Sequence, residues 1–280
     1  WWNGLAGVVI FSGSLPATRL AVADFDPLFL TGARAVLAGL LAAALLLAGR
    51  QQRPAREDLL PLVLVALGCV VGFPLLTAWA LTHITSAQAM VFIGALPLST
   101  ALFSVLRGGE RPRPAFWLFS VLGCGLVSAY ALAQGAAGSL AGDLLMLAAI
   151  AVCGLGYAEG ARLTPRLGGW QVISWSLVIS LPLMLPLAWA TLPMTFGSVR
   201  PSAWAGLAYV SVFSMLVGFI FWYRGLAQGG VAAVAQLQLL QPFLGMMLAS
   251  LVLGEQVTWP MGLSALAVIG CVAGARRYGR

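Results

Sequence analysis

The residues most able to do chemistry in this chain are polar side chains set inside long apolar segments. Trp79 and His83 are four residues apart and Gln238 and Gln241 are three apart, so each pair shares one face of a helix. A polar side chain is costly in lipid, and it therefore either bonds to a neighbouring helix or serves a function. Our candidates for contact with a solute are Asn3, Ser14, Trp79, His83, Gln88, Tyr157, Ser211, Ser214, Gln238 and Gln241.

The usual sequence signatures of enzymes are missing. The chain has no Lys, which excludes a phosphate-binding GxxxxGK[ST] loop, and its single His excludes an HExxH zinc site. The four Cys residues lie singly in separate apolar segments, so we expect small buried residues and not disulfides. No GxSxG nucleophile motif occurs. We therefore predict that the protein is not an enzyme and uses no metal and no other cofactor.

Three ionisable residues inside apolar segments have two interpretations each. Glu159 either pairs with Arg162, three positions on, or is a proton- or cation-responsive coupling site. Arg34 either ties its helix to carbonyl groups or faces a cavity. His83 is either an interfacial residue or a gate or substrate contact.

Composition places these residues in a membrane. The chain is 61% hydrophobic and 8% charged, with a mean hydropathy of +0.97, whereas a soluble domain is about 25% charged. A bilayer core of about 30 Å needs about 20 helical residues, and the segments lack the alternation of barrel strands. We predict an all-α polytopic membrane protein of ten transmembrane helices, near residues 3–22, 27–48, 59–81, 86–106, 114–133, 142–162, 170–191, 203–224, 230–253 and 258–275.

The distribution of Arg predicts the orientation. Twelve of the fifteen Arg residues fall in loops on one side of this ten-span arrangement, Arg19 and Arg200 fall on the other, and Arg34 lies within a span. The positive-inside rule makes the twelve-Arg side cytoplasmic, with both termini there. Scattered over several loops, the net charge of +7 does not indicate nucleic-acid binding. The chain opens on Trp1 without a Met, so we expect some N-terminal residues to be missing.

One stretch of the sequence occurs twice. Residues 81–110 and 226–255 align without a gap at a fixed offset (242 − 97 = 145), matching Pro97 to Pro242 and Gly109-Glu110 to Gly254-Glu255. The halves, 1–134 and 135–280, would each hold five spans. Because five is odd, the second half must cross the membrane in the opposite orientation to the first half. Inverted repeats of this kind are typical of secondary transporters, with the substrate site near the midplane.

Pro97 and Pro242 fall near the middle of predicted spans four and nine. Each Pro removes a backbone hydrogen bond and bends its helix. Pro is also common in membrane helices without any special role. Because Pro97 and Pro242 occupy matched positions in the two halves, a role for both as gating residues is the second interpretation.

These features resemble the drug/metabolite transporter superfamily, and in particular its EamA-type ten-span branch. The resemblance rests on the duplicated Pro helix and Gly-Glu, on GSLPATR at 13–19, on TGAR at 31–34 and on ITSA at 84–87. It implies a bacterial inner-membrane, multi-pass transporter, with spans 1, 3, 4, 6, 8 and 9 around a central cavity and spans 5 and 10 packed together. Within the branch, the chain most resembles bacterial amino-acid exporters, including those for aromatic amino acids.

The expected partners are a small-molecule substrate and the lipid bilayer. Neutral polar groups among many aromatic residues suit small zwitterionic or aromatic solutes, and without an ATP-binding motif transport would be gradient-driven or facilitated. A purine, nucleoside or drug exporter of the same fold stays open, as does a non-transporting membrane scaffold. Gly270-xxx-Gly274 would serve either the contact between spans 5 and 10 or a homodimer.

Overall fold

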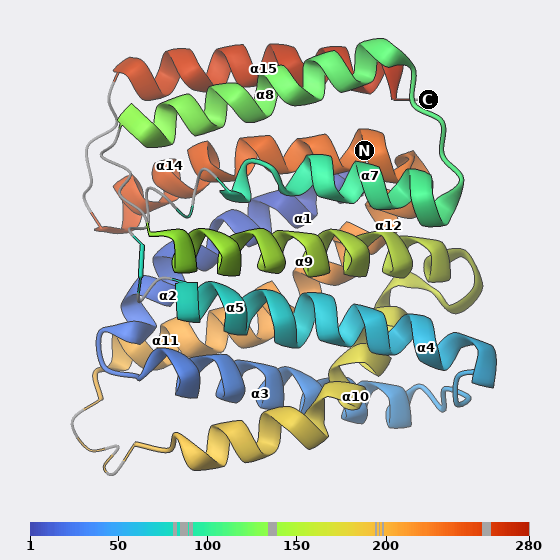
Figure 1. Ribbon diagram of the computed structural model, residues 1–280. Coiled ribbons are helices and arrows are strands. Elements are labelled where there is room, and N and C mark those ends of the chain that lie inside the picture. The colour runs from blue at the N-terminus through green and yellow to red at the C-terminus, as the bar shows by residue number, and fades with distance from the viewer. Residues whose placement is uncertain are drawn as a thin grey trace.

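A computed structural model describes residues 1–80, 83–84, 89, 92–133, 139–193, 195, 197, 199–253 and 259–279. Across these residues the chain forms helices and no strand, as the sequence predicts. Most helices run roughly along one common direction and are stacked in layers (Figure 1). Their bounds are α1 Trp2–Ser12, α2 Ser14–Val22, α3 Pro27–Ala48, α4 Arg56–Val65, η1 Ala66–Gly72, α5 Phe73–Ala80, α7 Leu96–Gly108, α8 Pro114–Ala133, α9 Leu140–Leu167, α10 Gly169–Ala190, α11 Pro201–Tyr209, η2 Val210–Val217, α12 Gly218–Gly229, α13 Val231–Ala235, η3 Gln236–Leu240, α14 Gln241–Leu253 and α15 Trp259–Tyr278.

Six helical stretches of the described chain are long and apolar enough to cross a bilayer. They are Trp2–Val22, Pro27–Ala48, Arg56–Ala80, Leu140–Leu167, Gly169–Ala190 and Pro201–Gly229, and shorter apolar helices cover Pro114–Tyr130 and Val231–Gly245. A helical, multi-pass membrane protein is thus confirmed. The count of ten spans stays a prediction.

Pairs of helices form the two edges of the stack, and both chain ends lie at one end of the bundle (Figure 1). α8 packs along α15 at one edge of the stack, and α3 packs along α10 at the opposite edge, with α1, α9 and α12 between them (Figure 1). The packing of α8 on α15 is the contact between spans 5 and 10 that the resemblance implies. Both chain ends lie at the same end of the bundle as the α7–α8 connection (Figure 1). This end carries Arg-rich loops and is called the Arg-rich end below.

Several helix boundaries recur along the chain at one separation. α14 begins and ends 145 residues after α7, and α15 begins and ends 145 residues after α8. The two π-helical segments, η1 and η2, also lie at nearly matching positions in the two halves. π-helical turns are rare and frequently occur at functional sites.

The two duplicated Pro residues act differently on their helices. Pro97 occupies the first turn of α7, where a missing N–H breaks no helical bond. Pro242 follows η3, where the Gln241 N–H bonds to the Gln238 carbonyl in 3-10 fashion. Because Pro242 cannot donate the α-helical bond that would follow, the chain tightens before it. The tightened segment, η3, is the one that carries Gln236 and Gln238.

Glycines allow two of the closest helix contacts. Gly68 of η1 lies against the Gly156 region of α9, where an added Cβ would come within 3.1 Å of the Gly156 Cα. At the edge of the stack, Gly274 faces Phe119 of α8. Gly274 therefore serves the contact between α8 and α15 within one chain. A homodimer stays a prediction.

Candidate functional site

Four aromatic side chains from three helices pack edge to face in the middle of the bundle. Phe11 comes from α1, Tyr157 from α9, and Phe219 and Trp222 from α12, and all are buried. The ring centroids of Phe11 and Phe219 are 5.1 Å apart, and those of Tyr157 and Trp222 are 5.5 Å apart. This geometry suits the quadrupoles of the rings and builds an apolar wall. We call Phe11, Tyr157, Phe219 and Trp222 the aromatic cluster.

Polar groups lie directly on this cluster. The Gln238 Nε2 donates to the Tyr157 hydroxyl at 3.3 Å, joining η3 to α9. The Gln238 Oε1 and the Trp222 Nε1 are buried without a hydrogen-bond partner among the described residues. Each such unpaired group costs about 1–3 kcal/mol. One free acceptor and one free donor beside aromatic walls are what a small polar solute needs for binding.

Gln236 is the second amide of η3 and is fully buried. Both its Nε2 and its Oε1 are without a partner in the described part of the chain. Sequence reasoning missed this residue, although it stands two positions before Gln238. The signal was the run of three Gln residues at 236, 238 and 241 just ahead of a Pro.

Two cysteines and a tyrosine extend the cluster toward η1. The Tyr223 hydroxyl lies 3.5 Å from the Cys69 Sγ and donates to the Gly156 carbonyl at 3.4 Å. Cys69 and Cys153 are buried and free, as the sequence predicts. Cys124 is likewise buried and free, whereas Cys271 is free and half-buried.

Several predicted site residues instead have hydrogen-bond partners within the bundle itself. Ser14 donates to Ser214 at 2.8 Å, which joins α2 to η2, and Ser211 donates to the Leu207 carbonyl of its own helical turn at 2.6 Å. Asn3 donates to the Gln228 Oε1 at 2.8 Å, which joins α1 to α12. The bonds of Ser14 and Asn3 match the alternative interpretation of polar residues as contacts between helices.

The remaining predicted residues lie at the periphery or outside the described chain. Trp79 is 61% exposed, and His83 is exposed in the turn after α5. Gln241 is half-buried at the start of α14. Gln88 lies outside the described residues. Of the candidates, the structure brings together Ser14 with Ser214 and Tyr157 with Gln238, and beside the second pair it adds Trp222.

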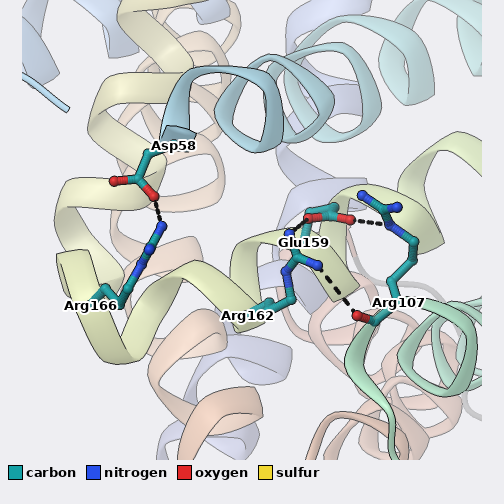
Figure 2. Close-up of polar contacts among 5 residues, drawn as sticks. All are labelled: Asp58, Arg107, Glu159, Arg162 and Arg166. Carbon is teal, nitrogen blue, oxygen red and sulfur yellow. Dashed lines mark hydrogen bonds and ion pairs between the residues drawn. The ribbon is translucent and has the colours of Figure 1, made fainter. Parts of the chain in front are cut away.

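Glu159 sits between two arginines near the Arg-rich end (Figure 2). Its side chain is 0% exposed; Arg107 Nε donates to its Oε1 at 2.6 Å, and Arg162 Nη2 lies 3.3 Å from its Oε2. The pairing with Arg162 was one of the two sequence interpretations, whereas Arg107 arrives from α7 and was missed. A buried carboxylate needs such partners. The ion pairs match the structural interpretation of Glu159, and its role as a coupling site stays a prediction.

Other ion pairs join helix ends on both sides of the bundle. Arg166, at the end of α9, contacts Glu57 at the start of α4 at 2.9 Å. It also contacts the neighbouring Asp58 (Figure 2). At the opposite end Arg200 pairs with Asp24 at 2.9 Å, and this contact holds the pKa of the Asp24 carboxyl below its ordinary value. Arg34 is half-buried in α3, and its Nε has no partner among the described residues.

Comparison with known proteins identifies the family of this fold. The EamA-like transporter family matches residues 2–130 and 140–276. The chain is 64% identical over 280 residues to the uncharacterized transporter YdeK of Bacillus subtilis, covering 100% of this chain and 98% of that protein. It is 24% identical over 278 residues to a protein of Streptantibioticus cattleyicolor named a probable terminal-alkyne amino-acid exporter, covering 99% of this chain and 93% of that one. A solved crystal structure superposes with a TM-score of 0.82 at 20% identity, over 98% of this chain and 96% of the other.

Proposed function

The chain belongs to the EamA-like transporter family, and we propose that it is a secondary transporter that exports amino acids or related small metabolites. One observation carries the substrate class. Unpaired buried polar atoms of Trp222 and Gln238 lie beside aromatic rings, and both of these side chains are uncharged. Such a site favours a solute with hydrogen-bonding groups, an apolar side chain and no net charge.

The chemistry of each contact follows from the atoms. The indole N–H of Trp222 can donate only, so it suits a carboxylate, and the Oε1 of Gln238 accepts only, so it suits an ammonium group. The rings of Phe11 and Phe219 would bury the apolar side chain. A relative named as an amino-acid exporter supports this assignment, although it is distant.

We further propose that two inverted repeats, residues 1–134 and 135–280, carry out alternating access with ten spans. The recurrence of helix bounds at 145 residues supports a duplication, and so does the separate family match in each half. The cytoplasmic assignment of both termini rests on the Arg bias and on their position at one end of the bundle (Figure 1). The membrane would be the inner or plasma membrane of a bacterium.

The test is uptake into proteoliposomes over a panel of solutes, with and without a pH gradient. We expect neutral amino acids with large apolar side chains to be transported, and organic cations and sugar phosphates to be excluded. Transport of purines or nucleosides but of no amino acid would contradict the proposed substrate class and support the proposed transport function. Absence of transport for the whole panel would favour the membrane scaffold.

A further inference from the structure

The Gly109-Glu110 pair ends α7 with a specific turn. Gly109 has φ +70°, a left-handed conformation that glycine adopts without strain. The Glu110 N–H bonds back to the Ser104 carbonyl at 3.3 Å, so the chain reverses tightly at the end of the helix. This geometry explains why a Gly precedes Glu110.

The carboxylate of Glu110 holds the start of α13. Its two oxygens accept the N–H groups of Val231 at 2.7 Å and of Ala232 at 2.8 Å. These amides are left without helical partners at the beginning of a helix, and they attract a negative charge. Glu110 therefore joins α7 to the segment that runs through α13 into η3.

Arg107 joins the same end of α7 to a different helix. Its Nε binds Glu159 of α9 at 2.6 Å, and its backbone carbonyl accepts from Arg162 Nη1 at 3.4 Å (Figure 2). The end of α7 thus holds α9 through Arg107 and α13 through Glu110. We call these contacts of Arg107 and Glu110 the latch.

The latch is close in sequence to Tyr157 of the aromatic cluster on α9, and to Gln238, which bonds to Tyr157, on the segment that follows α13. Glu159 follows Tyr157 by two residues in α9, and Gln238 follows Val231 by seven residues, about two helical turns or 11 Å. A hollow of about 420 Å³ lies beside Glu110, lined by Glu110, Arg111, Gln228, Gly229, Gly230 and Gly279. Water can therefore reach the latch from the Arg-rich end.

We propose that Arg107 and Glu110 form the gate of the Arg-rich end, closed in this structure and released when that end opens. The proposal rests on the proposed transport function. An equilibrium between two states shifts only through contacts that differ between them. In the open state Glu110 and Glu159 would exchange these partners for water, which the exposed side chain of Arg107 and the hollow permit.

The native cysteines Cys69 and Cys153 can report the opening, because they are 3% and 1% exposed beside the aromatic cluster. The background is C124A/C271A, in membrane vesicles of both orientations, labelled with a small membrane-impermeant methanethiosulfonate. A cysteine introduced at the exposed Arg113 in a separate variant marks the vesicles that present the Arg-rich end.

We expect Glu110→Gln and Arg107→Gln to speed labelling of Cys69 and Cys153 from the Arg-rich end by about tenfold. This corresponds to a loss of about 1.4 kcal/mol in the preference for the closed state over the open state. Arg166→Gln is the matched control, because it breaks an ion pair at the same end without touching α7. It should leave the rate within about twofold of the parent, because its partners Glu57 and Asp58 belong to α4 and not to the latch.

If Glu110→Gln is poorly folded, Gly109→Ala provides a milder disturbance of the same turn and should speed labelling in the same direction. Parent-like labelling in both the latch variants and Gly109→Ala would overturn the proposal and leave these contacts as helix fasteners. Faster labelling without any amino-acid transport would keep the latch and reject the substrate class. Amino-acid transport together with parent-like labelling of the latch variants would reject the latch as a gate and keep the substrate class.

Discussion

Trp222 offers the most specific test at the scale of single residues, because its indole N–H is buried and unpaired among the described residues. Trp222→Phe keeps an aromatic ring and removes the donor. If a substrate carboxylate accepts from it, the half-saturation concentration for amino acids should rise by about tenfold, the equivalent of 1–3 kcal/mol for a lost buried partner. Initial uptake rates over a range of amino-acid concentrations measure this.

The matched control is Ser180→Ala, which removes a buried hydroxyl that bonds to the Leu177 carbonyl of its own helix, α10. It should leave the half-saturation concentration unchanged. Equal effects of the two variants would mean that Trp222 only supports packing.

Sequence reasoning found only part of the site residues. Tyr157 and Gln238 were recognised because polar atoms in apolar spans are costly, and the structure joins them. Trp79 and His83 have correct helical spacing, but spacing fixes only a shared face and not what that face meets; both lie exposed. Arg107 was missed because its partner Glu159 comes from a helix 52 residues away.

At the scale of elements, the 3-10 segment before Pro242 is the feature that places Gln238. Pro242→Ala would restore a backbone donor and let η3 become α-helical, which changes the direction of the Gln238 side chain. We expect the maximal transport rate to fall at least about tenfold while the amount of folded protein falls less, because removing Pro stabilises a regular helix.

The control for this change is Pro186→Ala in α10, a helix that contributes nothing to the aromatic cluster. Transport rates are compared with the yield of monodisperse purified protein for both variants. Parent-like rates in Pro242→Ala would mean that the 3-10 segment has no part in the mechanism. Pro97→Ala should have a smaller effect than Pro242→Ala, since Pro97 sits in the first turn of α7.

Helix ends were predicted well where the chain carries local signals. α3 and α8 begin at Pro27 and Pro114 and end where the apolar segment ends, as expected from hydropathy. α9 runs past its predicted end to Leu167, because Arg162 and Arg166 find carboxylate partners and continue the helix beyond the apolar segment. The π-helical turns were not predicted, since hydropathy does not distinguish i−5 from i−4 hydrogen bonds.

At the scale of the whole molecule, the inverted repeat predicts opposite positions for the two Gly-Glu motifs. Single cysteines at 110 and 255, in a background without native cysteines, should react with an impermeant reagent from opposite sides of the membrane. Position 110 should react from the side of both termini. Reaction of both positions from one side would contradict the inverted duplication and the ten-span count.

The central claim is that neutral amino acids cross the membrane by alternating access through the cluster of Tyr157, Trp222 and Gln238. Counterflow in proteoliposomes tests it most directly. Vesicles loaded with an unlabelled amino acid of large apolar side chain should transiently accumulate the labelled amino acid without any ion gradient. Gln238→Leu should reduce this accumulation by about tenfold at subsaturating substrate, whereas Ser180→Ala should retain it. Absence of counterflow with every neutral amino acid, or full counterflow in Gln238→Leu, would contradict the account.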